Sequence, residues 1–356
     1  MNGFLSVALL IVMSAALFML PLIPAMAELN RKSDAQPLSV IQQHAGEIRH
    51  FADRFRLYIK ELEPLLLQAV NTGTTLSGTL PDKTEYLVLG SGKEALRLPL
   101  RQSDETCPVL LATGIDLSLP PDTAFSKDVY VAGRFRGGTK NRYRAILGEK
   151  EVDLGAESHV MRWVHAVGNF SAGPACQLHG RVSSDTGIQL SGGDSTFQRL
   201  NAPQIQFGNP PMSSDFADTA EPSDSWATPP RLLHDGNFEI PDGQTFRGNL
   251  VARGVLRIGR HARILGDVKG DRGVVVDEGA ILRGSLISSN TMRIGANCDI
   301  HGPVIAEKVL ILERGTRCGS AEKPTTVSAP WIQVEEGVVV FGTLWAREHG
   351  AVVAKV

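Results

Sequence analysis

The sequence has few aromatic residues, few cysteines and no excess of charge. Aromatic residues make up 6% of its 356 residues, and 36 basic and 38 acidic side chains give a formal net charge of −2. This balance leaves no basic face for phosphates, so nucleic acid is not an expected partner. The cysteines are too few and too scattered for a disulfide scaffold, and they fit a reducing compartment. They are Cys107, Cys176, Cys298 and Cys318.

Recognisable catalytic motifs are absent as well. The chain has no G-x-S-x-G nucleophile elbow, no Walker loop, no H-E-x-x-H zinc motif and no dinucleotide fingerprint. No obvious helix follows the glycine pairs Gly137-Gly138 and Gly192-Gly193, so we interpret them as turns rather than phosphate cradles. We therefore predict that the protein is not an enzyme and has no catalytic, cofactor-binding or metal-binding residue. No cofactor and no small-molecule substrate are expected.

What the sequence does contain is a repeat of 18 residues between Val255 and Cys318. Apolar and polar residues alternate within each unit, which is the period of a strand rather than of a helix. We expect the chain to coil into rungs of three short strands whose stacked inner faces form one apolar column. The predicted fold class is all-β, a parallel β-helix solenoid. Five columns show the period: Ile258, Val276, Ile294, Leu312; Ala262, Ala280, Cys298, Thr316; Ile264, Leu282, Ile300, Cys318; Gly266, Gly284, Gly302; Val268, Leu286, Val304.

A fainter version of the repeat occupies the first half of the chain, where the 18-residue step becomes visible after about Val152. The segment Cys176–Val182 resembles Cys298–Val304, and Ala202–Gln206 resembles Ala329–Gln333. Both similarities indicate an internal duplication. Earlier in the chain there are only strand candidates, at 86–89, 109–112 and 129–132. The later columns are Leu154, Ala172, Leu190; Val160, Leu178, Thr196; Val164, Val182, Leu200.

These patterns predict a first β-helical segment over 71–207 with an irregular start, a linker over 208–236 and a second segment over 237–356. The linker is rich in Pro, Ser, Asp and Ala, which cannot form a packed core, so we expect it to be flexible. The last rung is followed by Ala351–Val356, which has no evident polar cap. An uncovered rung exposes strand edges, so pairing of this end with other molecules, and thus polymerisation, is expected.

The N-terminus is expected to anchor the protein in a membrane over residues 1–27. Residues 4–23 carry no charged side chain and are long enough for a helix that crosses a bilayer. A signal peptide cleaved near 25–27 is the alternative, but a signal peptide has a basic start and this chain has none. Arg31 and Lys32 follow the span, which places the C-terminal bulk on the cytoplasmic side of the inner (cytoplasmic) membrane as a single-pass protein.

The region 28–70 is predicted to contain a juxtamembrane amphipathic helix, over 39–70. Apolar residues recur there at steps of three and four, with charged residues largely elsewhere. We expect this helix to cap the first coil or to pack on it. Self-association and a position on the membrane surface are the alternatives.

Two Cys-x-x-His pairs, Cys176 with His179 and Cys298 with His301, raise the possibility of a zinc site. The repeat argues against it, because Cys298 occupies a column that points into the core and His301 lies one step beyond an inward residue. We therefore interpret the thiols as core residues and the histidines as surface residues.

The period also fits six-residue units, as in the left-handed helix of hexapeptide acyltransferases, where a histidine acts as general base. His261, His301 and His349 are the candidates, but the sequence points to neither an orienting partner nor a pocket. A basic cluster over Arg253–Arg263 is a further candidate, for contact with lipid headgroups.

The second segment resembles the bactofilins, the polymer-forming cytoskeletal proteins of bacteria. The resemblance covers 238–349 and rests on Val255–Gly259, Val276–Gly284, Met292–Gly295 and His301–Val304. It implies a right-handed parallel β-helix, association into filaments end to end, often at a membrane, and no catalytic residues. The membrane span, the helix and the second coil depart from the plan of that family.

We therefore expect a membrane-anchored, bactofilin-like scaffold that contacts the lipid bilayer and either self-associates or recruits protein partners. Two alternatives remain open from the sequence. One is a hexapeptide-repeat acyltransferase, and the other is a non-catalytic binding module exposed outside the cytoplasm.

Overall fold

The computed structural model describes residues 49–91, 98–101, 105–208 and 231–353, together with isolated residues between 9 and 23. The chain divides into two compact units, residues 1–46 and 47–356. Most of the predicted membrane span and of the linker, and the helix start at 39–48, lie outside the described residues. Among the residues that are described, no helix combines the length and the apolar character that crossing a bilayer requires.

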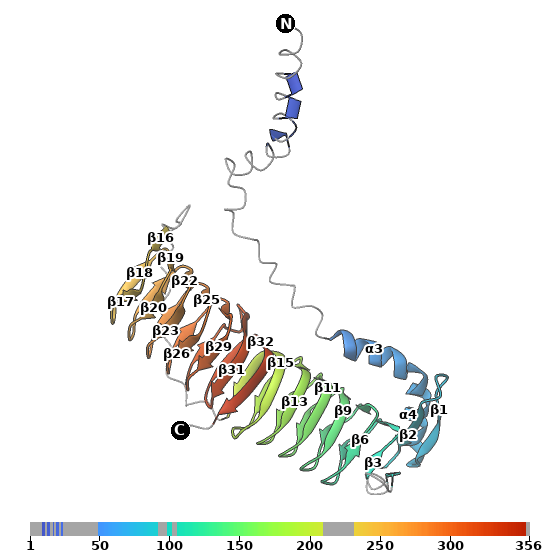
Figure 1. Ribbon diagram of the computed structural model, residues 1–356. Coiled ribbons are helices and arrows are strands. Elements are labelled where there is room, and N and C mark those ends of the chain that lie inside the picture. Colours follow the sequence, from blue (N-terminus) through green and yellow to red (C-terminus); the bar gives the residue numbers. More distant parts are fainter. Residues whose placement is uncertain are drawn as a thin grey trace. The chain divides into compact units, whose positions relative to one another are not determined.

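The unit 47–356 is a β-solenoid of about 13 turns, which confirms the predicted repeat fold. Its strands form two coils, which we call the first coil and the second coil (Figure 1). The first coil consists of β1 (Leu76–Thr79), β2 (Glu85–Leu89), β3 (Thr106–Cys107), β4 (Leu110–Thr113), β5 (Leu117–Ser118), β6 (Ala124–Phe125), β7 (Val129–Val131), β8 (Phe135–Arg136), β9 (Arg142–Gly148), β10 (Val152–Leu154), β11 (His159–Ala166), β12 (Phe170–Ala172), β13 (Gln177–Ser184), β14 (Ile188–Leu190) and β15 (Thr196–Phe207).

The second coil begins at residue 231, and its strands are short and regular up to β30, followed by the long strands β31 and β32. They are β16 (Arg231–His234), β17 (Phe238–Ile240), β18 (Thr245–Arg247), β19 (Asn249–Ala252), β20 (Val255–Ile258), β21 (Arg263–Leu265), β22 (Val268–Gly270), β23 (Gly273–Val276), β24 (Ile281–Leu282), β25 (Leu286–Ser288), β26 (Met292–Ile294), β27 (Asp299–Ile300), β28 (Val304–Ala306), β29 (Val309–Leu312), β30 (Arg317–Cys318), β31 (Thr325–Glu335) and β32 (Val339–Val353).

In the second coil the 18-residue columns of the sequence are strand neighbours in space. From β16 to β28 each strand pairs in parallel with the third strand after it, so these rungs consist of three strands, as predicted. At the end of the coil β29 pairs with β31 and β30 with β32. Val276, for example, pairs with Ile258 on one side and with Ile294 on the other. The columns of Ile258, Ala262, Ile264 and Val268 are buried throughout, so they form the continuous apolar shaft.

Glycines stack at one corner of this coil. A Cβ placed on Gly284 would lie 2.2 Å from the carbonyl oxygen of Gly266, and one on Gly302 would lie 2.3 Å from that of Gly284. No real Cβ approaches backbone atoms so closely, so the 18-residue glycine column is required by the contact between rungs.

The first coil departs from a strict 18-residue step. Phe135 pairs with Val152 and Tyr143 with Val160, both steps of 17, whereas Tyr86 pairs with Leu110. Rungs from β9 onward have two strands rather than three, and the longer strand bends at a bulge, as between Val160 and Trp163 in β11. Varying rung lengths explain why the sequence shows no strict period before 152.

One predicted column of the first coil is wrong at its last position. Val160 pairs with Leu178 as expected, but Leu178 pairs with Phe197 rather than with Thr196. The cause is one additional residue in the turn that precedes β15. Phe197 is therefore buried in the shaft, whereas Thr196 pairs with Gln177.

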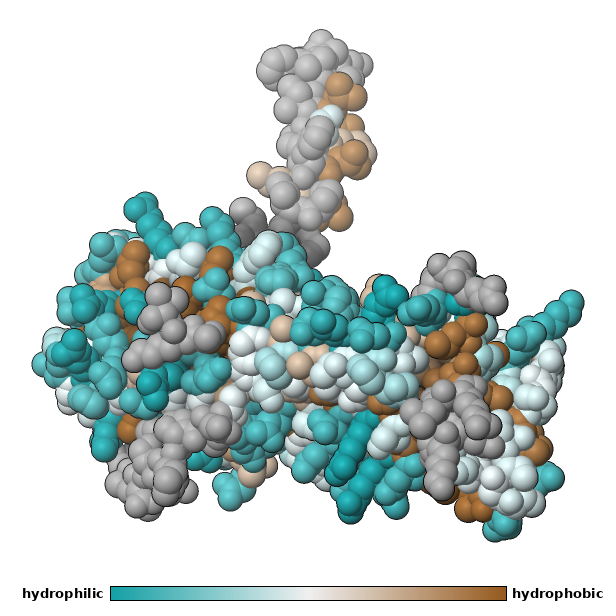
Figure 2. Space-filling model, turned by 90° about the horizontal axis from the view of Figure 1, so that it is seen from below, coloured by the Kyte–Doolittle hydropathy of each residue, from teal (hydrophilic) through white to brown (hydrophobic). Residues whose placement is uncertain are grey.

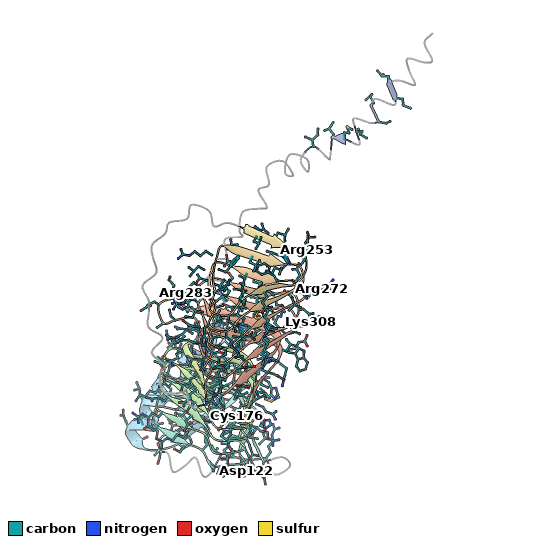
Figure 3. The ribbon with its side chains drawn as sticks, turned by 90° about the vertical axis from the view of Figure 1, so that its left-hand side faces the viewer. Asp122, Cys176, Arg253, Arg272, Arg283 and Lys308 are labelled. Atoms are coloured by element: carbon teal, nitrogen blue, oxygen red, sulfur yellow. The ribbon has the colours of Figure 1, made fainter. Side chains whose placement is uncertain are left out.

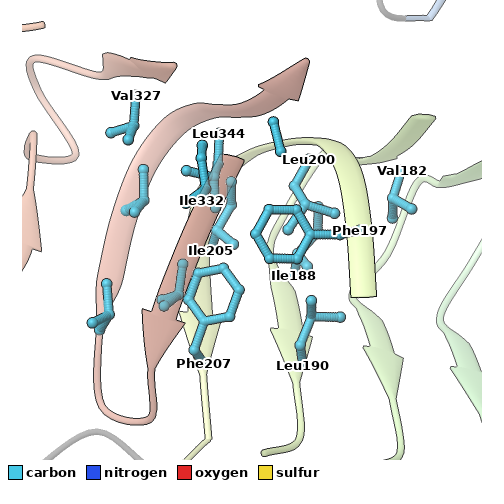
Figure 4. Packing of buried hydrophobic residues seen from close by; sticks show 14 of the residues in the cluster. Val182, Ile188, Leu190, Phe197, Leu200, Ile205, Phe207, Val327, Ile332 and Leu344 are labelled. Atoms are coloured by element: carbon cyan, nitrogen blue, oxygen red, sulfur yellow. The ribbon is translucent and has the colours of Figure 1, made fainter. Parts of the chain in front are cut away.

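The two coils meet end to end through their last rungs. β15 pairs antiparallel with β32, with Leu200 opposite Leu344 and Ile205 opposite Val340 (Figure 1). Phe197 and Phe207, whose ring centroids are 5.8 Å apart, fill the shaft at this junction (Figure 4). The predicted polymerisation through an uncovered C-terminal rung is therefore wrong, because β15 already covers β32.

Two helices cover the flank of the first coil. They are α3 (His50–Ile59) and α4 (Glu63–Thr72), joined by the 3-10 turn η2 (Lys60–Leu62). Their buried face packs on a second apolar cluster that includes Leu110, Ala145 and Trp163. Arg56 also donates hydrogen bonds of 2.8 and 3.0 Å to Glu149. The described part of the predicted amphipathic helix thus packs on the first coil, which confirms the favoured interpretation for 50–70.

The outer ends of the unit differ. In the first coil, β1 pairs antiparallel with β2 and so covers the outer edge of that strand. In the second coil, β16, β17 and β18 each have a described strand partner on one side alone. Leu232 and Leu233 of this rung are 41% and 54% exposed, and Phe238 and Phe246 are partly buried.

Candidate functional site at the junction of the coils

The cysteines of the two Cys-x-x-His pairs point into the shaft. Cys176 and Cys298 are fully buried, whereas His179 is exposed and His301 is half-buried on the outside. Burial raises the pKa of the Cys176 thiol to about 11 and that of Cys298 to about 12. Within the described part of the chain, no group of three or more His, Cys, Asp or Glu side chains is arranged to hold a metal ion.

The raised thiol pKa values predict a loss of stability in alkali. A thiol with a raised folded-state pKa stabilises the fold fully below its usual pKa of 9.0, and that contribution is lost as the pH rises toward the folded-state value. One pKa unit corresponds to about 1.4 kcal/mol. Ionisation of each thiol in the unfolded chain should therefore lower the free energy of unfolding by about 2 kcal/mol by about pH 10.5. Denaturant unfolding at about pH 8 and about pH 10.5 measures this loss. A Cys176→Ala, Cys298→Ala variant should lose clearly less unfolding free energy than the wild type over this pH range. An equal loss would contradict the conclusion that burial raises the pKa of these two thiols.

His301 has an orienting partner that the sequence did not reveal. Its Nε2 lies 2.8 Å from Oδ2 of Asp299, and the Arg283 guanidinium contacts the same ring nitrogen. Arg283 also lies 3.9 Å from Asp299. Because Asp299 and His301 are two residues apart on one face, they form a local cluster of a carboxylate, an imidazole and a guanidinium.

A buried serine, histidine and aspartate also meet in the first coil. Nδ1 of His165 lies 2.9 Å from Oγ of Ser183, and its Nε2 lies 3.8 Å from Oδ1 of Asp185. Arg49 pairs with the same Asp185 oxygen at 2.8 Å. His165 is 1% and Ser183 4% exposed, so no substrate reaches the hydroxyl, and this group links the helix region to β11 and β13.

The predicted lipid-binding cluster is spread around one rung rather than gathered. Arg257 lies in β20 and Arg263 in β21, on different sides of the coil. Arg253 and Arg257 also pair with carboxylates, those of Asp235 and Asp277. Figure 3 shows Arg253, Arg272 and Lys308 along one side of the second coil and Arg283 on another.

A groove of about 490 Å³ lies at the junction of the coils, and we call it the junction groove. Its walls come from α3, from β11, β13 and β15 of the first coil, and from β32 of the second. Four arginines line it, and none of its described lining residues is Asp or Glu. The arginines are Arg162, Arg181, Arg199 and Arg347.

Strand pairing sets the order of the side chains in the junction groove. Trp163 pairs with Arg181, Arg181 with Arg199, and Arg199 with Trp345 across the antiparallel junction. Neighbouring strands are about 4.8 Å apart, so two like charges stand side by side between two tryptophans. A bulge precedes this position in β11 and in β13, and Gly180 fits there because a Cβ would strike the backbone of Arg162.

Aromatic rings hold the two central arginines. The Arg181 guanidinium carbon lies 4.9 Å from the centroid of the Phe51 ring, and that of Arg199 lies 5.1 Å from the ring of Trp345. Burial, and then the positive charge of Arg181, lower the pKa of Arg199. Its buried Nε has no hydrogen-bond partner. Sequence reasoning missed this site, although the 18-residue step from Trp163 to Arg181 and Arg199 signals part of it.

Comparison with known proteins identified no relative of this chain. No protein-family model matches this chain, and searches of curated proteins and of solved structures found no significant match.

Proposed function

We propose that this protein is a membrane-anchored structural scaffold of the bactofilin type. In this proposal residues 1–27 form a single-pass anchor in the inner (cytoplasmic) membrane, and the right-handed coils lie on the cytoplasmic side. The solenoid acts mechanically, as a stiff rod that self-associates or recruits protein partners beside the bilayer.

One observation carries this proposal: the chain already joins two solenoids end to end. The β15–β32 junction pairs two strands that would otherwise be exposed edges, and apolar side chains of both coils meet in one shaft. A rung that pairs in this way within a chain uses the same chemistry that would pair rungs of separate chains.

The rung β16–β18 offers a place for such pairing between molecules. Its outer strand edges have no partner among the described residues, and Leu232 and Leu233 expose large apolar side chains beside them. On the face shown in Figure 2, hydrophobic residues gather toward the two ends of the coils, and the middle is mainly hydrophilic. An end that is both apolar and unpaired favours association over a monomer in water.

Electron microscopy and light scattering of residues 28–356, which include the whole compact unit 47–356, test self-association. We expect dimers or longer assemblies that dissociate at least tenfold more readily in a Leu232→Lys, Leu233→Lys variant. The matched control is Leu57→Lys, Leu67→Lys, which changes two leucines of the helices that are even more exposed, 72% and 68%, and should leave assembly intact. A monodisperse monomer at every salt and protein concentration would contradict the polymer proposal.

A second candidate function is a hexapeptide-type acyltransferase, which the contact between His301 and Asp299 favours. A carboxylate 2.8 Å from a ring nitrogen orients an imidazole as a general base requires. Loss of an acyl-CoA-dependent activity in a His301→Ala variant, but not in His261→Ala, would establish this function.

The third candidate, a binding module outside the cytoplasm, would be established if a reporter fused after Val356 were active on that side alone.

A further inference from the structure

The junction groove concentrates positive charge, and carboxylates of the described chain compensate only part of it. Arg347 pairs with Glu307 at 3.6 Å, but neither Arg181 nor Arg199 has a carboxylate partner among the described residues. Two arginines in adjacent rungs repel each other, and the strands prevent them from separating. A bound anion would relieve this repulsion.

The way the arginines are held leaves their hydrogen-bonding edges available. Each guanidinium lies over a ring, Arg181 over Phe51 and Arg199 over Trp345, so one face is covered. The N–H donors lie in the plane of the guanidinium, so a ring against one face does not block them. The buried Nε of Arg199 has no partner at all. Such a preorganised fork matches the two oxygens of a carboxylate.

The shape and the surroundings of the groove indicate the kind of molecule that carries the carboxylates. Arg181 and Arg199 are half-buried between the helix and the corner of the rungs, where a narrow extended chain reaches and a flat lipid surface does not. The groove crosses four rungs, about 15 Å, which is the length of about five extended residues. Met161 and Trp345, 59% and 41% exposed, lie beside the arginines and can contact apolar side chains.

We propose that the junction groove binds an extended acidic peptide segment of a partner protein, with Arg181 and Arg199 as its carboxylate-binding pair. Trp345 and Arg347 come from the second coil and the other three arginines from the first, so the groove exists only when the coils are joined. The inference rests on the partner-recruiting part of the proposed function, and it holds equally for a monomer and for an assembly.

The test measures binding of a fluorescein-labelled oligoglutamate peptide to the full chain in a neutral detergent at low salt. We expect Arg181→Gln, Arg199→Gln to weaken binding about a hundredfold, since each charged pair contributes about tenfold. The matched control, Arg263→Gln, Arg272→Gln, removes the same charge from exposed sites of the second coil and should change binding less than about twofold. Arg181→Lys, Arg199→Lys keeps the charge but loses the fork, and should bind about tenfold more weakly than wild type.

Two further probes distinguish other sources of the anion: polygalacturonate, an acidic polysaccharide, and a soluble short-chain phosphatidylglycerol. Binding of either one at least tenfold more tightly than oligoglutamate, with the same dependence on Arg181 and Arg199, would overturn the peptide assignment. Absence of oligoglutamate binding, or equal weakening in the groove and control variants, would overturn the site itself. Circular dichroism confirms that each variant retains its strands, and light scattering on the same samples reports assembly separately from binding.

Discussion

Replacing Gly284 by alanine is expected to destabilise the second coil by about 3 kcal/mol. The new Cβ would lie 2.2 Å from the Gly266 carbonyl oxygen and 2.4 Å from its carbon. Both atoms belong to the neighbouring rung, so the clash is relieved only by displacing strands and weakening their hydrogen bonds. The shift of the denaturant midpoint and hydrogen exchange in β22 and β25 measure the effect.

Gly243 provides the control for that substitution. It has a φ of +69° in a turn, and a Cβ there would meet no atom within 4 Å. Gly243→Ala therefore carries only the strain of a left-handed residue, about 1 kcal/mol. If both variants lost the same stability, the contact between rungs at the glycine corner would not be the reason for the 18-residue glycine column.

A Val340→Asp substitution should open the junction between the coils. Val340 is fully buried opposite Ile205, and an unpaired carboxylate in the apolar shaft costs about 4 kcal/mol. We expect the amides of β15 and β32 to lose their protection from hydrogen exchange, while the middle of each coil retains it. The newly exposed edges should also make the protein associate in a concentration-dependent way.

The neighbouring residue on the same strand gives a matched control. Val339 is half-exposed and pairs with Gln206 and Arg317, so Val339→Asp places the same carboxylate outside the shaft. This variant should retain the protection of β15 and β32. Equal exchange in the two variants would mean that β32 tolerates any charge and that burial at the junction does not hold the coils together.

The fold of the second coil followed from the sequence because its rungs from β16 to β30 all have the same length. A constant step keeps Ile258, Val276 and Ile294 in one column, so the period of the sequence directly gives the register of the strands. In the first coil, steps of 17, 18 and 19 occur from β9 onward, and the bulged long strands absorb the difference. A search for a single period therefore fails there, and at β15 it places Thr196 where Phe197 lies.

The junction and its groove were beyond sequence reasoning for a different physical reason. The local sequence of β15 and of β32 does not indicate which strand pairs with each of them, because an open strand edge pairs equally well with any matching edge. Trp345 is far from Arg199 in sequence and reaches it only across this antiparallel contact. By contrast, the sequence spacing does predict that Trp163, Arg181 and Arg199 lie side by side on neighbouring strands, since 18 residues separate each from the next.

The antiparallel junction has a consequence for direction. Because the last rungs of both coils meet, each outer end of the rod is the beginning of a coil, and the chain winds toward the junction from both ends. A filament assembled from such units through like ends would have no polarity, so a motor or a growing tip could not distinguish its two directions. Within one unit the two halves remain different, because β1 and the helices α3 and α4 belong to the first coil alone.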